Sequence, residues 1–260
     1  MNTELKKKLD YHYERYKTEP LSPDPLEIPH LFTSPLDIEF TAFISAIFAY
    51  GSVTQILKTL YSILEILGKN PHEKLMNDKK LLRQLKNSQI SYRFYSNDDV
   101  VNLFKIIRKA YAKHGSLKNL FVKNYSCKHE NLKNEIETFS LWFLKECEKA
   151  RCLSRGFKFM FPLPSKGSAV KRMNLFLRWM VRKDNFDFGL WSKIKRNQLL
   201  IPVDTHIARI SRELGLTSRK NIDWKTAVEI TDNLKKFDSK DPVKYDFALC
   251  HIGIRKEYFD

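Results

Sequence analysis

The sequence contains few of the residues that build tight turns, crosslinks or membrane spans. Its 260 residues include 8 Gly and 10 Pro, which is sparse for a β-sandwich or barrel with many turns. The 4 Cys have no Cys-x-x-Cys spacing, so we expect no zinc site, iron–sulfur cluster or secreted disulfide framework. No run of 18 apolar residues occurs, and the charged residues 1–16 hold no apolar signal segment. We therefore expect a cytoplasmic protein with no membrane partner.

Acidic residues are also in short supply. The chain has 30 Asp and Glu against 46 Lys and Arg, a formal net charge of +16. A polyanion is the natural partner of such a chain, because each phosphate that is neutralised releases condensed counterions. A general bias towards lysine is the alternative, and it would spread the charge evenly over the surface. The charge favours a nucleic-acid partner and, with it, a location at the nucleoid.

Apolar residues, by contrast, are plentiful: 43% of the chain is hydrophobic, with 18 Phe and 11 Tyr, enough for a sizeable core. They recur at helical spacing, and no strand-like alternation is found. We predict an all-α fold, with an N-terminal helix and Pro-rich segment (1–30), a helical lobe (31–160) and a motif-bearing segment (161–260) in one compact unit. The expected helices span residues 3–17, 36–50, 53–67, 97–113, 130–150, 169–181, 204–214, 223–236 and 242–257.

The first segment that suggests chemistry leads into the helix expected from residue 169. The amides of its first turn would face outward as an anion site with basic side chains beside it; the residues concerned are Gly167, Ser168, Ala169, Lys166 and Arg172. Lys171 follows in the first turn, where the helix dipole and partial burial would both lower its pKa. A neutral amine is what a lysine nucleophile needs. The alternative is an ordinary solvated surface lysine.

The second segment centres on Asp204, which follows Pro202 and Val203 and precedes an amphipathic helix. Aspartate is among the best helix N-caps, and that role does not exclude a catalytic one. Asp204 and His206 could also be metal ligands of a phosphohydrolase, but the further His and Asp ligands of such a site are missing. We expect no metal and no cofactor, and we place His206 near the same helix end, against the DNA backbone.

These two segments resemble those of endonuclease III and its relatives in the helix-hairpin-helix DNA glycosylase superfamily. The similar stretches are Lys171-Arg-Met-Asn174 and Pro202-Val-Asp204-Thr-His206. The resemblance implies that Lys171 is the nucleophile and Asp204 the essential aspartate. Their separation, 204 − 171 = 33 positions, is closer to that of the archaeal 8-oxoguanine DNA glycosylase/AP lyases, which also lack an iron–sulfur cluster. Leu163-Pro-Ser-Lys-Gly167 stands where the relatives have Leu-Pro-Gly-Val-Gly, so one glycine of the hairpin is absent.

The last expected helix carries Asp246 and Cys250 one turn apart on the same face. In the archaeal group an acidic residue of a comparable late helix contacts the flipped base, so the resemblance implies a base pocket at Asp246 with Cys250 beside it. A buried cap or salt-bridge aspartate and a core cysteine are the alternative. Core or interface positions are expected for the four tryptophans, one of which would stack on the base; they are Trp142, Trp179, Trp191 and Trp224.

The whole chain from residue 36 onward also resembles an uncharacterised bacterial family of about this length. The segments that carry this likeness are Ala49-Tyr-Gly51, Tyr92-Arg-Phe94, Arg178-Trp-Met-Val-Arg-Lys-Asp184 and Lys244-Tyr-Asp-Phe-Ala-Leu249. They indicate membership of that family and give no activity.

Together these features predict a two-lobed helix-hairpin-helix glycosylase-like fold. Lys171, Asp204 and parts of residues 36–67 would line a central cleft that takes an extruded damaged base from double-stranded DNA. The expected activity is base-excision repair of an oxidised purine such as 8-oxoguanine by a monomer, with a lysine Schiff base and an AP lyase step. The alternative is a non-catalytic helical DNA- or RNA-binding protein on the same fold.

Overall fold

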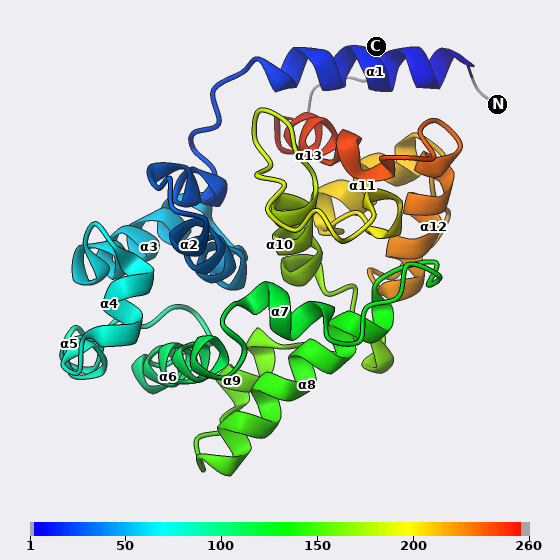
Figure 1. The fold of residues 1–260 in the computed structure, drawn as a ribbon. Helices are drawn as coiled ribbons and strands as arrows, with labels where there is room; N and C mark the ends of the chain where they lie inside the picture. Colours follow the sequence, from blue (N-terminus) through cyan, green and yellow to red (C-terminus); the bar gives the residue numbers. More distant parts are fainter. Residues whose placement is uncertain (1–2, 256–260) are drawn as a thin grey trace. The chain divides into compact units, whose positions relative to one another are not determined.

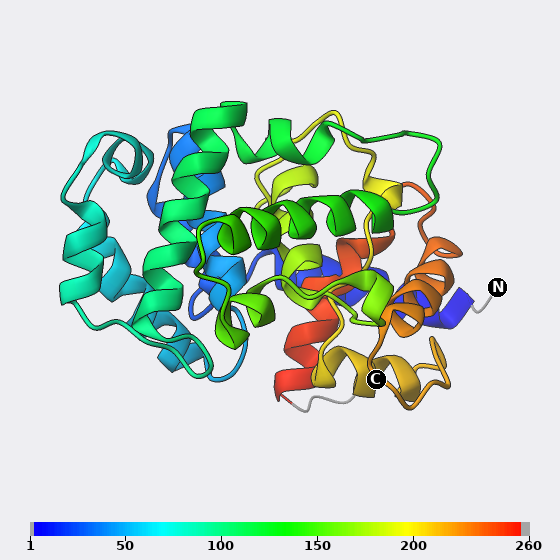
Figure 2. The same ribbon diagram turned by 90° about the horizontal axis from the view of Figure 1, so that it is seen from below.

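The computed structural model describes residues 3–255. Within that range the chain forms helices joined by loops, and it contains no β-strand (Figures 1 and 2). The predicted all-α class is confirmed. The longer helices are α1 (Thr3–Lys17), α2 (Pro35–Phe48), α3 (Val53–Leu67), α6 (Asn97–His114), α8 (Lys133–Lys149), α10 (Lys171–Val181), α11 (Thr205–Glu213), α12 (Trp224–Lys235) and α13 (Asp246–Arg255). Shorter ones are α4 (Pro71–Asn77), α5 (Leu81–Asn87), α7 (Leu117–Val122) and α9 (Arg155–Met160).

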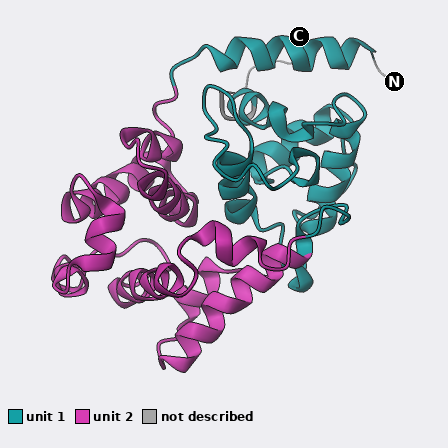
Figure 3. Ribbon diagram, viewed as in Figure 1, with its two compact units in different colours: residues 1–20, 126–133, 164–260 teal, residues 21–125, 134–163 magenta. Residues whose placement is uncertain are grey.

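The chain forms two compact units, each assembled from separate stretches (Figure 3). Unit 1 consists of residues 1–20, 126–133 and 164–260, and unit 2 of residues 21–125 and 134–163. Helix α1 therefore belongs with the C-terminal helices and not with the segments that follow it.

Unit 2 is built around α2, which is buried on nearly every side, as its almost uniformly apolar sequence predicts. Edge-to-face aromatic pairs fill the space beside it, among them Phe43 with Phe139 of α8 at 5.8 Å between ring centroids. Glu39, one of the buried acids of this region, accepts hydrogen bonds from the Tyr111 hydroxyl (3.0 Å) and the Leu117 amide (2.8 Å). Glu39 thus satisfies the first free N–H of α7 and fixes where that helix starts.

In unit 1, α1 packs against α13 and the 3₁₀ turn Pro242–Tyr245 that precedes it (Figure 1). The polar helix buries Leu9 and Tyr16, which the spacing of its few apolar residues anticipates. The Tyr245 hydroxyl donates to Asp10 at 2.7 Å, across 235 positions of sequence. Helices α11 and α13 also contact each other, so the last helix lies between the first one and the helix that follows Asp204.

Several local expectations were wrong. Helices α4, α5, α7 and α9 have six or seven residues each and were not predicted, because fewer than two turns give no clear period. Helix α9 lies between the helices expected at 130–150 and 169–181, where no helix was predicted. The helix expected from residue 169 begins at Lys171. The expected helix 242–257 opens as a 3₁₀ turn before α13.

Candidate active site

Asp204 acts as the N-cap of α11, and it uses only one of its two oxygens to do so. Its Oδ1 accepts from the backbone amides of His206 (2.9 Å) and Ile207 (3.0 Å). Its Oδ2 lies 2.9 Å from the Lys171 ammonium nitrogen. The structural and the chemical interpretations of this aspartate are therefore compatible, since one oxygen caps the helix while the other faces the candidate nucleophile.

Lys171 is the first residue of α10 and follows a left-handed residue, Val170, with φ 42°. That conformation costs a β-branched residue about 1–3 kcal/mol, so the surroundings must hold it. Val170 is buried, and two hydrogen bonds from Asn174 stabilise the turn. The Asn174 backbone amide donates to the Val170 carbonyl and its side chain to the Ala169 carbonyl, both at 3.1 Å. The strained turn aims Lys171 at Asp204. About a third of the Lys171 side chain and a fifth of that of Asp204 are exposed, so a ligand can reach the pair.

The electrostatics of the pair differ from expectation. Burial, the largest influence, lowers the pKa of Lys171, but Asp204, Cys250 and Asp246 together outweigh it and leave that pKa above the ordinary lysine value. Burial likewise raises the pKa of Asp204, but the Lys171 ammonium and the Ile207 amide bring it below the ordinary aspartate value. The prediction of a neutral Lys171 amine is wrong for the protein without substrate, because Lys171 and Asp204 form an ion pair.

Asp246 and Cys250 both belong to the surroundings of Lys171, because each raises its pKa. Asp246, the first residue of α13, is 3% exposed, and Arg178 of α10 donates to its carboxylate. Burial raises the pKa of Asp246 to about 6 against the lowering effect of Arg178. The structure thus gives Asp246 the salt bridge of the alternative interpretation, within electrostatic reach of the Lys171–Asp204 pair. Cys250 is partly buried.

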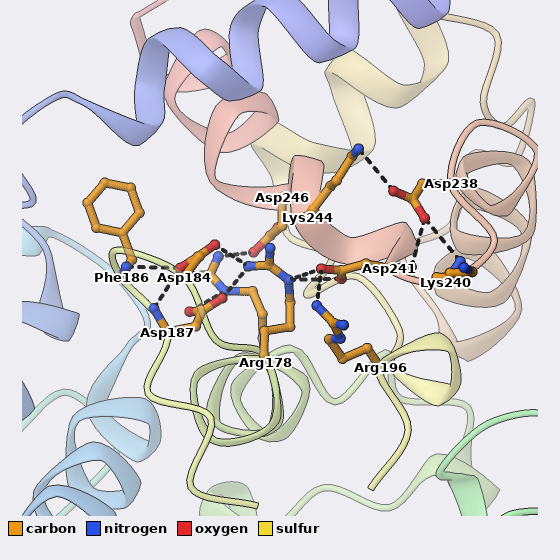
Figure 4. A network of polar contacts seen from close by, with 11 residues as sticks. Arg178, Asp184, Phe186, Asp187, Arg196, Asp238, Lys240, Asp241, Lys244 and Asp246 are labelled. Carbon is orange, nitrogen blue, oxygen red and sulfur yellow. Dashed lines mark hydrogen bonds and ion pairs between the residues drawn. The ribbon is translucent and has the colours of Figure 1, made fainter. Parts of the chain in front are cut away.

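A network of buried ions extends from Arg178 along the C-terminal end of α10 (Figure 4). Arg178 also contacts Asp187 at 3.3 Å, and Arg182 lies between Asp187, Asp184 (2.9 Å) and Asp241 (2.9 Å). Burial lowers the pKa of Arg182, but these carboxylates raise it by more, so the pKa lies above the ordinary arginine value. The segment Arg178–Asp184, which the sequence singled out without a role, is therefore the core of an ion network that joins α10 to the chain before α13.

The residues expected at the DNA backbone differ in their exposure to solvent. Lys166, Gly167 and His206 are exposed, Ser168 is half-buried, and Arg172 is buried. Because α10 starts late, the expected row of free amides is not formed in full: the Gly167 amide donates to the Pro164 carbonyl at 3.0 Å. The Ser168 hydroxyl accepts from the Val170 amide at 3.1 Å. Gly167 has φ +84°, a left-handed turn that suits the one glycine retained in this loop.

Unit 2 contains a cluster of side chains that the sequence did not assign to function, the aromatic–arginine cluster of Tyr50, Arg93, Phe94 and Phe159. Phe94 is 61% and Phe159 41% exposed, and their ring centroids lie 5.1 Å apart. The Tyr50 ring is nearly parallel to that of Phe94, and the Arg93 guanidinium lies 5.4 Å from the Tyr50 centroid. Phe94 and Phe159 meet edge to face, with 70° between their planes, so the cluster presents exposed aromatic rings beside a cation, against which another π-system can stack.

Close backbone contacts hold this cluster together. The Phe94 amide donates to the Tyr50 hydroxyl at 3.4 Å, and the Tyr92 hydroxyl donates to the Tyr50 carbonyl. Gly51 has φ +99°, and a Cβ there would lie 2.6 Å from the Arg93 guanidinium. The sequence marked segments 49–51 and 92–94 as features of a family. That the two segments contact each other is visible only in the folded structure.

The tryptophans are placed as core residues. Trp179, Trp191 and Trp224 are buried, and Trp142 packs edge-on against His114 and Phe143. Within residues 3–255, no helix combines the length and the apolar character needed to cross a bilayer. The same described part of the chain contains no group of three or more His, Cys, Asp or Glu placed to hold a metal ion.

Comparison with known proteins identifies a family. Residues 24–255 match the family described as protein of unknown function (DUF2400), and the chain belongs to that family. No curated protein and no solved structure matches the chain.

The buried pair of Arg178 and Asp246 leads to a stability prediction. Asp246→Asn removes one of the two carboxylates around a buried guanidinium, which by itself costs about 3 kcal/mol. It also removes a buried charge, whose desolvation raises the pKa of Asp246, so the net loss in the free energy of unfolding should be smaller and should shrink as pH rises. The ordinary aspartate pKa is about 3.9, so the folded state of the unchanged protein holds an extra proton between roughly pH 4 and pH 6. The contribution of Asp246 to stability therefore falls as pH rises through that window, and the variant should lack this component. Urea denaturation across the window measures both effects.

Asp232→Asn is the control, because its partner Lys235 is on the surface and the pair should contribute less than about 1 kcal/mol. An Asp246→Asn protein of unchanged stability that prefers another lesion would show that Asp246 serves the base pocket and not the fold.

Proposed function

We propose that this member of the family is a base-excision DNA glycosylase with AP lyase activity, acting as a monomer on double-stranded DNA that contains an oxidised purine such as 8-oxoguanine. The two-lobed helix-hairpin-helix glycosylase-like fold and its central cleft are part of the proposal. The observation that carries it is the ion pair of Lys171 and Asp204, with 2.9 Å between Nζ and Oδ2 and access from solvent. A lysine nucleophile and a neighbouring carboxylate are the two groups that glycosylic bond cleavage through an imine requires.

The geometry supports a sequence of steps. A nucleotide that enters between the two side chains displaces the Lys171 ammonium from Asp204, and the ammonium proton passes to the departing base, directly or through the carboxylate. The neutral amine bonds to the sugar C1′ as the bond from C1′ to the base breaks. Asp204 remains ionised, since its pKa is lowered, and stabilises the positive charge that develops on the sugar. Ring opening yields the imine, from which β-elimination cleaves the strand.

The lysine of the resting protein is charged, which gives the carboxylate a second task. Because burial alone lowers the pKa of Lys171, separating the ammonium from Asp204 in a closed site makes the neutral amine easier to reach. Substrate entry would thus activate the nucleophile at the moment it is needed. In a binding protein without catalysis the pair would serve only the structure, and the experiments below distinguish the two.

Lys171→Gln is the decisive substitution. Duplex carrying 8-oxoguanine or an abasic site, treated with borohydride in the presence of the protein, should give a covalent adduct, because borohydride reduces the imine to a stable amine. Lys171→Gln should abolish the adduct and leave the affinity for undamaged duplex almost unchanged, since one of 46 basic residues is lost. Gel electrophoresis measures the adduct and fluorescence anisotropy the affinity.

Lys220→Gln is the matched control, because this lysine is also exposed on unit 1 and lies outside the candidate site. It should form the adduct normally. An adduct of full yield in Lys171→Gln, or none with any oxidised purine or abasic site, would reject the lysine mechanism; the second result would favour the binding-only alternative.

Asp204→Asn tests the carboxylate without removing the helix cap, because asparagine also caps well. Base release should slow by about 10²–10³-fold, the usual loss when a stabilising group is removed from a developing charge. The pKa of Lys171 should fall, because the main counter-charge disappears while burial remains. The acid limb of the rate of imine trapping on a preformed abasic site should therefore move to lower pH.

Asp223→Asn provides the comparison, since Asp223 caps α12 and pairs with Arg219 at 3.0 Å. It should leave both measurements unchanged. Base release at the normal rate in Asp204→Asn, with an unshifted pH profile, would refute the role proposed for the pair.

The aromatic–arginine cluster offers a separate test of nucleic-acid binding. Exposed rings stack on unpaired bases with about 1–3 kcal/mol per base, whatever the sequence. Phe94→Ala and Phe159→Ala should each weaken binding to DNA with a single-stranded gap by that amount and reduce the quenching of 2-aminopurine placed in the gap. Tyr61→Ala is the control, as this exposed ring of unit 2 hydrogen-bonds Glu27 outside the cluster. Equal losses in all three variants would argue against base stacking.

A further inference from the structure

A basic hollow lies in unit 1 at the end of α10 remote from Lys171. It is lined by Val181, the last residue of that helix, and by four cationic side chains: Lys183, Lys195, Arg196 and Lys240. With a rise of 1.5 Å per residue, the ten steps from Lys171 to Val181 place it about 15 Å along the helix from the candidate nucleophile. The hollow is therefore a separate feature and not an extension of the Lys171–Asp204 pair.

The charges of the hollow are all of one sign. None of the described residues that line it is acidic, and the four cationic residues are all exposed. They come from three stretches of chain: the segment after α10, the turn at residues 195–198 and the loop before residue 242. Like charges gathered on a concave surface repel one another and concentrate a positive potential there. Such an arrangement becomes favourable when an anion occupies it.

The nearby acids do not neutralise this surface, because the ion network already engages them (Figure 4). Asp184 and Asp241 each pair with the buried Arg182 at 2.9 Å, and Asp238 pairs with Lys244 at 3.0 Å. Arg196 lies 3.7 Å from Asp241, and half of its side chain is still exposed. These aspartates contact other cations and do not line the hollow.

The hollow also offers uncharged donors and a defined shape. Ser192 and Asn197 line it, and both can donate to phosphate oxygens beside the planar Arg196 guanidinium. Gly189, with φ +67°, sits against Lys183, and a Cβ at that position would lie 2.6 Å from the Lys183 Cβ. The glycine therefore allows the lysine-bearing segment to fold closely onto the loop that forms the opposite wall.

We infer that this basic hollow is an anion-binding site that holds the phosphodiester backbone of nucleic acid, about 15 Å along α10 from Lys171. The inference concerns partner binding and stands whether or not Lys171 is a nucleophile. A lone phosphate group shares the same chemistry, and the experiment separates the two sources.

The test is the salt dependence of binding to undamaged duplex DNA. The triple variant Lys183→Gln/Lys195→Gln/Lys240→Gln keeps Arg196, which contacts Asp241. Each phosphate contact contributes about 0.9 to the slope of log K against log salt, so the triple variant should lose about 2–3 from that slope. The control is Lys7→Gln/Lys220→Gln/Lys225→Gln, which removes the same charge from exposed positions of unit 1. It should lose less than about 1.

Two further measurements make the outcome unambiguous. Titration calorimetry with inorganic phosphate should show no saturable binding at concentrations that leave DNA binding intact, and the borohydride adduct at saturating DNA should form equally in the triple variant. Equal slopes for the two triple variants would overturn the inference, and so would tight phosphate binding that is lost in the hollow variant without a change in the DNA slope. A reduced slope in a protein that never forms the adduct would support the hollow and reject only the glycosylase proposal.

Discussion

A guanidinium that is taken out of water has to be matched by carboxylates, and unit 1 is organised around that requirement. Arg178 of α10 and Arg182, directly after that helix, are each 4% exposed and pair with four aspartates from the chain around them. Two of these aspartates, Asp241 and Asp246, flank the turn that leads into α13. Removing either arginine would strand buried negative charge, so the position of α13 relative to α10 is tightly specified. The surroundings of Lys171 follow from that placement, because α13 carries Asp246 and Cys250.

The charged groups of the candidate site are matched by partners in the same way. Asp204 places one oxygen on the amides of α11 and the other on Lys171, so the helix that fixes the carboxylate also fixes the direction from which its partner must approach. Lys171 is in turn aimed by a left-handed valine that only close packing can hold. Strain at one residue and capping at another thus bring two side chains together from elements 33 positions apart in sequence.

The sequence predicted the long helices within a few residues of their ends, since three or more turns repeat the apolar period often enough to be seen. It missed α9, whose six residues lie in a stretch rich in Phe and Pro. The pairing of Lys171 with Asp204 was implied by the family resemblance, but the direction of the Lys171 pKa was not, because it depends on how far Asp204, Cys250 and Asp246 outweigh burial. The cluster at Tyr50 was also hidden, since its contacts with Tyr92 and Phe94 cross more than 40 positions of sequence.

The hydrogen bond from Tyr245 to Asp10 has a consequence for how the protein is made. Translation produces α1 before α13 and the turn that precedes it, and these form the surface that α1 covers. All of unit 2, whose stretches end at residue 163, has been synthesised before the α13 segment that α1 contacts. Contacts so distant in sequence close slowly, because a long loop must be ordered first. The face of α1 that carries Leu9 and Tyr16 therefore stays uncovered until residues 242–255 have been made.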